Sequence, residues 1–394
     1  MEKTINECFF QIQNGANIKQ GDVEGGFPIT RIETTANDKF NRDRMGYAGI
    51  TDISKYEAYV LEDGDLLMSH INSVQYLGRT VLYIKQPDEI IIHGMNLLRL
   101  KARRNIINPA YARYCFYGHT FRCQIGNITK KSVNQASFAV KDLKQIKIEV
   151  PSLDVQNKVV VILDRVQKLI DMRNNELASL DDLIKARFVE MFGNPVINEK
   201  RWRQKSLGEI TTKIGSGATP KGGKGAYQEE GITLIRSMNV HNGLFEYKEL
   251  AHISDEQATK LDNVVIEEND VLLNITGASV ARSCVVPSKI LPARVNQHVC
   301  IIRCKKCINP EFLNKLLIDD NYQDLLWSIA GAGATREAIT KQQVENLQII
   351  MPPIELQIEF MRFCNQVNKS KFAVQKTLEQ TQTLFDSLMQ KYFG

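Results

Sequence analysis

The chain has 394 residues, of which 43% are hydrophobic and 24% are charged, and its formal net charge is +5. This composition is typical of a globular protein with enough apolar residues for two or three domains. The mild positive charge permits nucleic-acid binding but does not by itself indicate it. No stretch approaches the ~18 uncharged apolar residues of a membrane-spanning helix.

The eight cysteines are scattered, and the residues after Met1 contain no apolar signal-peptide core. We therefore expect a cytoplasmic protein with reduced thiols. Residues 1–100 combine glycine-rich turns with short β-branched runs, of which 81–84 and 90–92 are the clearest predicted strands. Asn108-Pro109 then predicts the start of a helix that runs through Tyr114 and Phe121, because Asn caps a helix and Pro suits its first turn.

Residues 146–150 alternate as a half-buried strand, and a long helix follows over 154–192. Apolar residues recur along it at heptad spacing, which is typical of a coiled coil and would extend about 58 Å. Gly193, followed by Pro195, is expected to end the helix. The main apolar row is Leu163, Ile170, Leu177 and Ile184, and Ile162, Leu169 and Leu183 are expected to widen it.

The sequence repeats itself 201 residues further on, and such a repeat fixes the architecture before any motif is interpreted. The second copy of the helix carries Val367 and Val374 in one apolar row and Leu378 and Phe385 in the other. Weaker echoes join 11–16 to 213–218 and 65–69 to 270–274. The matched pairs are Asn108-Pro109 with Asn309-Pro310, Pro151 with Pro352, Gln156 with Gln357, and Phe192-Gly193 with Phe393-Gly394.

We therefore predict a mixed α/β protein with an internal pseudo-twofold repeat. Two globular domains, residues 1–150 and 195–350, alternate with two long helical segments, residues 151–194 and 351–394. The helices are expected to pair as an antiparallel coiled coil. Arg173, Arg187 and Lys371 interrupt their apolar rows.

Two patterns resemble enzyme motifs. Asn108-Pro109-Ala110-Tyr111 resembles the Asn-Pro-Pro-Tyr signature of adenine-N6 methyltransferases, but its recurrence as Asn309-Pro310 favours a helix N-cap in each half. Cys300, Cys304 and Cys307 have the spacing of the radical S-adenosylmethionine cluster motif. Cys300 also lies in an apolar run typical of a buried strand, which favours small buried thiols over a metal site.

Residues 217–224 look like a phosphate-binding loop but lack its Gly-Lys-Ser/Thr register. We predict no catalytic residue and no metal ligand. Basic residues gather in predicted loops, with tyrosines among them, as expected for a surface that contacts phosphates. The candidates for DNA contact are Arg31, Arg42, Arg44, Lys130, Lys131, Lys221, Lys224, Arg236, Arg282 and Arg336.

Taken in order, these features resemble the specificity subunit of type I restriction-modification enzymes. The resemblance rests on Pro151-x4-Gln156 leading into a helix that ends Met191-Phe192-Gly193, and on three motifs of the second half. These motifs are 215–220 (Gly-Ser-Gly-Ala-Thr-Pro), 276–279 (Thr-Gly-Ala-Ser) and 333–336 (Gly-Ala-Thr-Arg). They add Thr219 and Ser279 to the candidates for DNA contact.

The resemblance implies a non-catalytic subunit that reads a bipartite, asymmetric site on double-stranded DNA, one half-site per domain. It also implies that the helices dock two methyltransferase subunits, and it leaves room for restriction subunits as further partners. Arg173, Arg187 and Lys371 would then partly face those partners. S-adenosylmethionine, ATP and Mg²⁺ are then expected only on those partners. Two alternatives are a protein-binding scaffold without DNA affinity and a radical S-adenosylmethionine-type enzyme built on the Cys300 motif.

Overall fold

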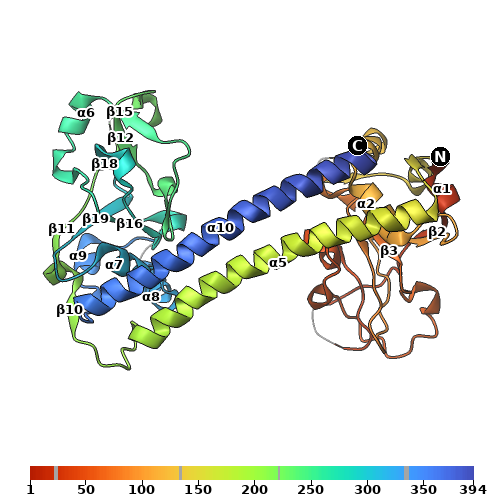
Figure 1. The fold of residues 1–394 in the computed structure, drawn as a ribbon, viewed down its shortest axis with the longest axis horizontal. Coiled ribbons are helices and arrows are strands. Elements are labelled where there is room, and N and C mark those ends of the chain that lie inside the picture. The colour runs from red at the N-terminus through yellow and green to blue at the C-terminus, as the bar shows by residue number, and fades with distance from the viewer. Residues whose placement is uncertain (22–24, 133–134, 221, 332–336) are drawn as a thin grey trace. The chain divides into compact units, whose positions relative to one another are not determined.

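The computed structural model describes residues 1–21, 25–132, 135–220, 222–331 and 337–394. The chain forms two compact units: unit 1 combines Met1–Asn175 with Gln375–Gly394, and unit 2 is Glu176–Val374. Each unit contains one globular domain and part of both 40-residue helices, α5 (Leu153–Phe192) and α10 (Ile354–Phe393) (Figure 1). The mixed α/β class and the two long helices confirm the predicted architecture.

The domain of unit 1 is built on a four-stranded antiparallel sheet in the order β2-β6-β3-β5. Its strands are β2 (Phe9–Asn14), β3 (Leu66–Ser69), β5 (Thr80–Leu82) and β6 (Leu97–Ala102). The smaller elements are β1 (Glu2–Thr4), α1 (Ile5–Cys8), β4 (Ile71–Asn72), α2 (Pro109–Tyr117), α3 (His119–Ile128), β7 (Lys130–Lys131), β8 (Ala136–Ser137), α4 (Val140–Leu143) and β9 (Lys147–Glu149). The β1–β9 pair brings the chain's first residues beside the start of α5.

The domain of unit 2 repeats this sheet in the order β11-β19-β16-β17. Its strands are β11 (Thr211–Ser216), β16 (Val271–Asn274), β17 (Ser283–Val285) and β19 (Val299–Cys304). The weak sequence echoes between the domains thus fall on equivalent strands, β2 with β11 and β3 with β16. The smaller elements include β10 (Gln204–Ser206), β13 (Val240–His241), β14 (Leu244–Phe245), α6 (Asp255–Thr259), α7 (Pro310–Leu317), α8 (Asp320–Gly331), α9 (Lys341–Glu345) and β20 (Gln348–Ile350).

Unit 2 also contains a second sheet, β15-β12-β18, with a core of its own. Its strands are β12 (Ile232–Ile235), β15 (Ala251–Ile253) and β18 (Ala293–Val295). In unit 1 the corresponding pairing is reduced to isolated bridges from Ile92 to Ile29 and Val60. The predicted strand at 90–92 was therefore wrong, because too few of its backbone groups are paired to form a ladder.

The helix predicted from Asn108 was right at its start and wrong in its extent. The Asn108 side chain caps α2 by accepting a hydrogen bond from the backbone N–H of Ala110 at 2.8 Å. At Gly118 the backbone turns to an extended conformation, so that Phe121 belongs to a second helix, α3. The predicted C-terminal cap is confirmed, because Gly193 follows α5 with a φ of 74°.

In each unit, the start of one long helix packs beside the end of the other and both enter the domain core. In unit 1, Leu163 of α5 and Phe393 of α10 join the core that contains Tyr111. In unit 2, Phe188 and Phe192 of α5 and Phe360 of α10 pack around Phe312, with ring centroids 5.0–6.2 Å apart. The long helices are therefore part of each domain's core. Burying one such ring contributes roughly 1.5–3 kcal/mol to the stability of the unit.

A buried glutamine joins each long helix to its domain. In unit 1, Gln156 accepts a hydrogen bond from the backbone N–H of Asn108 at 2.8 Å and donates to the carbonyls of Ile106 and Pro151. In unit 2, Gln357 accepts from Asn309 at 2.9 Å and donates to Pro352. Both side chains are fully buried. The repeated Asn-Pro and Pro-x4-Gln motifs are therefore parts of one contact, which we call the glutamine joint.

Replacing the joint glutamine with leucine is expected to destabilise its unit. Gln156→Leu leaves the Asn108 N–H and two carbonyls buried without their partner, at a cost of about 1–3 kcal/mol for each unsatisfied group. Thermal unfolding should show a loss of several degrees. Gln357→Leu should do the same in unit 2.

The matched control is Gln382→Leu, because Gln382 is exposed on α10 and its side chain donates to Asp386 on the same helix. Its effect should stay within about 0.5 kcal/mol, as for most surface substitutions. Equal melting temperatures for the joint variants and the control would show that the joint contributes nothing to stability.

Candidate nucleic-acid interface

The two domains share one turn at the edge of the four-stranded sheet, between β3 and β5 in unit 1 and between β16 and β17 in unit 2. In unit 1, the backbone N–H of Ser69 donates to the carbonyl of Arg79 at 2.8 Å. In unit 2, the N–H of Asn274 donates to the carbonyl of Arg282, also at 2.8 Å. Arg79 and Arg282 therefore occupy the same position of what we call the repeated turn.

The repeated turn needs a left-handed residue just before its arginine. Gly78 fills that position in unit 1 with a φ of 72°, and Ala281 fills it in unit 2 with a φ of 71°. A non-glycine residue rarely adopts this conformation, so the surrounding hydrogen bonds must hold Ala281 there. Its N–H donates to the carbonyl of Asn274 at 2.9 Å, as that of Gly78 donates to Ser69 at 2.8 Å.

The two arginines differ in what surrounds them. In unit 1, the Arg79 guanidinium forms an ion pair with Asp38 at 2.8 Å and lies 4.7 Å from the ring centroid of Tyr76. Tyr117 also donates to Asp38, at 2.8 Å. In unit 2, no side chain among the described residues forms an ion pair or hydrogen bond with the Arg282 guanidinium. One domain therefore neutralises this charge and the other presents it.

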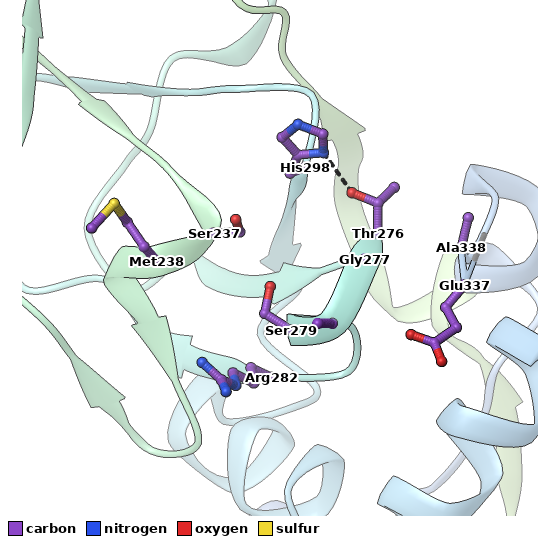
Figure 2. Close-up of a pocket in the computed structure, with 10 residues that line it drawn as sticks. Ser237, Met238, Thr276, Gly277, Ser279, Arg282, His298, Glu337 and Ala338 are labelled. Carbon is purple, nitrogen blue, oxygen red and sulfur yellow. Dashed lines mark hydrogen bonds between the residues drawn. The ribbon is translucent and has the colours of Figure 1, made fainter. Parts of the chain in front are cut away.

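Arg282 lines an open cavity of 1010 Å³ in unit 2 (Figure 2). The Oγ1 of Thr276 and the Nδ1 of His298 lie 2.5 Å apart in its wall, and Gln297 contacts the other ring nitrogen of His298 at 3.2 Å. Thr219, in turn, donates a hydrogen bond to Gln297. The cavity is lined by Ser237, Met238, Thr276, Gly277, Ala278, Ser279, Arg282, His298, Glu337 and Ala338.

Four candidates for DNA contact thus have defined places in unit 2. Ser279 and Arg282 line the cavity, and Thr219 reaches it through Gln297. Arg236 instead donates to the carbonyl of Glu249 and lies 5.5 Å from the ring centroid of Tyr227. Three further candidates cannot be placed: Lys221 and Arg336 lie outside the described residues, as does the side chain of Lys224.

In unit 1, two candidate arginines bond within their own domain. Arg31 donates to Gln20 at 3.0 Å and to the carbonyl of Gly21. Arg42 forms a two-pronged ion pair with Glu89, at 2.9 and 2.7 Å, and this pairing lowers the pKa of the Glu89 carboxyl to about 2. Much of the hydrogen-bonding capacity of both guanidiniums is therefore used before any ligand binds.

The other three unit 1 candidates are open to solvent. Arg44 is exposed, as are Lys130 and Lys131, which form the edge strand β7. Over the described part of the chain, their side chains form no ion pair. Such lysines and arginines suit contacts to a phosphate backbone, which need charge more than fixed geometry.

Sequence reasoning missed Arg79 and the pair Gln297 and His298. The signal for Arg79 was present, because Gly78-Arg79 matches Ala281-Arg282 at an offset of 203 residues. The offset differs from 201 because loops in the two domains differ in length. Gln297 and His298 carry no motif, and only the fold brings them to Thr219 and Thr276.

The cysteine motif does not form a cluster. Cys300 and Cys304 lie on strand β19, where burial raises the pKa of both thiols to about 12 and disfavours the thiolates that bind metals. Cys307 is exposed beyond the strand. Within the described residues, no group of three His, Cys, Asp or Glu side chains is placed to hold a metal ion. The same residues include no helix long and apolar enough to span a membrane.

The predicted coiled-coil rows lie at the helix interfaces within each unit. Their members are buried (Leu163, Ile170, Ile184, Val367 and Val374) or half-buried (Leu177, Leu378 and Phe385). The expectation that Ile162, Leu169 and Leu183 widen the rows was wrong, because these side chains are 39%, 47% and 45% exposed.

Two of the cations that interrupt the rows are paired inside unit 2. Arg187 of α5 forms an ion pair with Glu359 of α10 at 3.3 Å, and Lys371 of α10 pairs with Asp181 of α5. Our expectation that these cations partly face partner proteins therefore stays a prediction. In unit 1, α5 exposes an apolar stripe formed by Val155, Ile162, Leu169 and Met172, which are 39–54% exposed.

Comparisons with known proteins agree with this architecture. The family model of the type I restriction modification DNA specificity domain matches residues 2–181 and again residues 199–381. A relative from Methanocaldococcus jannaschii, named as a type I restriction enzyme MjaX specificity subunit, is 29% identical over 378 residues, covering 90% of this chain and 83% of the relative.

Two solved structures share the fold over the whole chain. The S subunit of a type I restriction-modification system from M. genitalium has a TM-score of 0.59 and 12% identity, with 96% of that chain covered. A chain from a type I R-M system, solved to describe complex assembly and conformational transition, has a TM-score of 0.60 and 18% identity, with 97% covered. With two copies of the specificity domain spanning most of its length, the chain belongs to the family of type I restriction-modification specificity subunits.

Proposed function

We propose that this chain is the DNA-recognition subunit of a type I restriction-modification complex and reads a split, asymmetric site on double-stranded DNA. The observation that carries the proposal is the presence of two specificity domains with one sheet order but different surfaces. The repeated turn illustrates the difference, since Arg79 is neutralised by Asp38 while Arg282 faces a cavity. Two unlike readers on one chain imply two unlike half-sites.

We propose that exposed basic residues position the duplex by contacting phosphates. The best placed of the described candidates are Arg44 and the two lysines of β7, Lys130 and Lys131. All three are exposed, and their side chains form no ion pair with the described residues. Each phosphate neutralised by a protein cation releases counterions, so affinity should fall steeply as salt concentration rises.

The same reasoning assigns partners. The apolar stripe on α5 offers a surface for a methyltransferase subunit. The number of two such subunits is what the resemblance to type I specificity subunits implies. The chain itself would then carry no catalytic residue: S-adenosylmethionine would bind the methyltransferases, and ATP and Mg²⁺ would bind a restriction subunit where one is present. A cytoplasmic location follows from this role.

The lysines of β7 can be tested by salt dependence. The double variant Lys130→Ala/Lys131→Ala should bind DNA more weakly, and the slope of log affinity against log salt concentration should become shallower by about 2, or about 0.9 per lost phosphate contact. Lys147→Ala, which removes another exposed lysine of the same domain, is the control. A slope identical to the unmodified complex would exclude both lysines from the interface.

The stripe can be tested by replacing two of its residues with polar ones. Ile162→Gln/Leu169→Gln should weaken association with the methyltransferase by about tenfold or more, because each buried aliphatic side chain contributes roughly 1.5–3 kcal/mol. Melting of the free chain should not change, since both residues are exposed.

The control is Ile197→Gln, which alters an apolar residue that is 74% exposed in the loop after α5. Co-purification and titration of the methyltransferase measure the effect. If the stripe variant assembles as tightly as the control, the stripe is not the docking surface.

The helices are expected to set the distance between half-sites. Deleting one heptad from each helix, residues 172–178 and 372–378, shortens each by about 10 Å, which corresponds to roughly three base pairs of B-DNA. Mapping of methylated adenines should then show loss of the original spacing in favour of a shorter one. A shortened protein that methylates only the original spacing would contradict the ruler role.

A further inference from the structure

The cavity beside the repeated turn of unit 2 has an unusual charge distribution for a phosphate-binding surface. Among the described residues that line it, the charged side chains are Arg282 and Glu337, which lie on opposite sides of the turn that carries Thr276 and Ser279 (Figure 2). The remaining polar groups are hydroxyls and the ring of His298. A carboxylate in the wall repels a phosphate, whereas the edges of base pairs offer both donors and acceptors.

The second domain lacks the acidic side chain that pairs with this arginine in the first domain, and this difference is visible in the sequence. In unit 1, Asp38 lies in the segment between Thr34 and Asn41, whose ends are joined by a hydrogen bond from the Asn41 N–H to the Thr34 carbonyl at 2.8 Å. In unit 2, the matching bond joins Glu246 to Asn239 at 2.8 Å.

The segment enclosed in unit 2 is the hairpin of β13 and β14, residues 240–245, and it contains no acidic residue. The position that neutralises Arg79 in unit 1 is therefore lost in unit 2. Arg282 is half-buried beside the cavity, and no described side chain bonds its guanidinium. Five N–H donors in a planar fork remain available for a ligand.

The commonest ligand for such a fork in a DNA groove is guanine, whose O6 and N7 accept two parallel hydrogen bonds. The Glu337 carboxylate in the same cavity suits the paired cytosine, because an acidic side chain accepts from its N4 amino group. A phosphate would satisfy Arg282 equally well but would meet the repulsion of Glu337.

We propose that Arg282 reads a guanine in the half-site bound by the second domain, and that Arg79, held by Asp38, does not read a base at the equivalent place. This inference rests on the proposed function and names one base pair of the site. The two domains therefore differ in specificity at a position where their backbones are alike.

The test uses the complex of the full chain with its methyltransferase. The wild-type complex is first mapped for methylated adenines, which gives the split motif. Arg282→Ala is then expected to accept any base pair at a single G·C position of one half-site, with about 10- to 100-fold of discrimination lost there. The rest of that half-site, the other half-site and the gap should be unchanged.

Arg79→Ala is the matched control, because it removes the same side chain from the same position of the other domain. It should leave the methylated motif intact. Arg282→Lys keeps the positive charge but lacks the planar fork of donors, so it should also lose discrimination at that G·C pair. This variant replaces Arg282→Ala in the test if the alanine variant does not fold.

Three results would overturn the inference: a wild-type motif without a G·C pair in either half-site, an Arg282→Ala complex with the unchanged motif, or equal weakening on every duplex sequence. The last would identify Arg282 as a phosphate contact. Failure of the proposed function is distinct, since it appears in the wild-type complex as the absence of any split motif.

Discussion

The structure depends on the buried amide at the start of each long helix. Gln156 and Gln357 are fully buried. They pair with carbonyls just before the long helices and with the backbone N–H groups of the residues that cap α2 and α7. An unpaired backbone group there costs more free energy than a typical hydrogen bond contributes. Separating the start of the helix from its domain is therefore strongly unfavourable. Within its unit, the start of each long helix is consequently fixed to the domain that it joins.

Repetition of the scaffold lets the domains diverge locally. The four-stranded sheet and the repeated turn place Arg79 and Arg282 alike, through backbone bonds that do not depend on side chains. Specificity then changes through one neighbouring segment, which is a 3-10 helical turn that ends at Asp38 in unit 1 and an uncharged hairpin in unit 2. A mutation in that segment can alter the ligand of the turn without disturbing the sheet that positions it.

The sequence predicted the long helices closely because their apolar period of seven persists over forty residues. It wrongly predicted a strand at 90–92 and a single helix from Asn108 through Phe121. Whether a short apolar run joins a ladder depends on partners far along the chain.

The same limit applies to the site. The partner of Arg42 is Glu89 and that of Arg79 is Asp38, each more than forty residues away. Local charge therefore cannot separate structural arginines from those free to bind DNA.

The helix interface shows how one pair of helices can serve both the fold and an assembly. Leu163, Ile170 and Ile184 point into the units, and the cations that would spoil the interface are matched by Asp181 and Glu359 across it. Exposed pairs of this kind contribute little stability, but their geometry fixes which faces meet. With the inner face specified in this way, Val155, Ile162 and Leu169 are left outside as a continuous apolar stripe. A helix that needed those residues for its own packing would have no such surface to offer a partner.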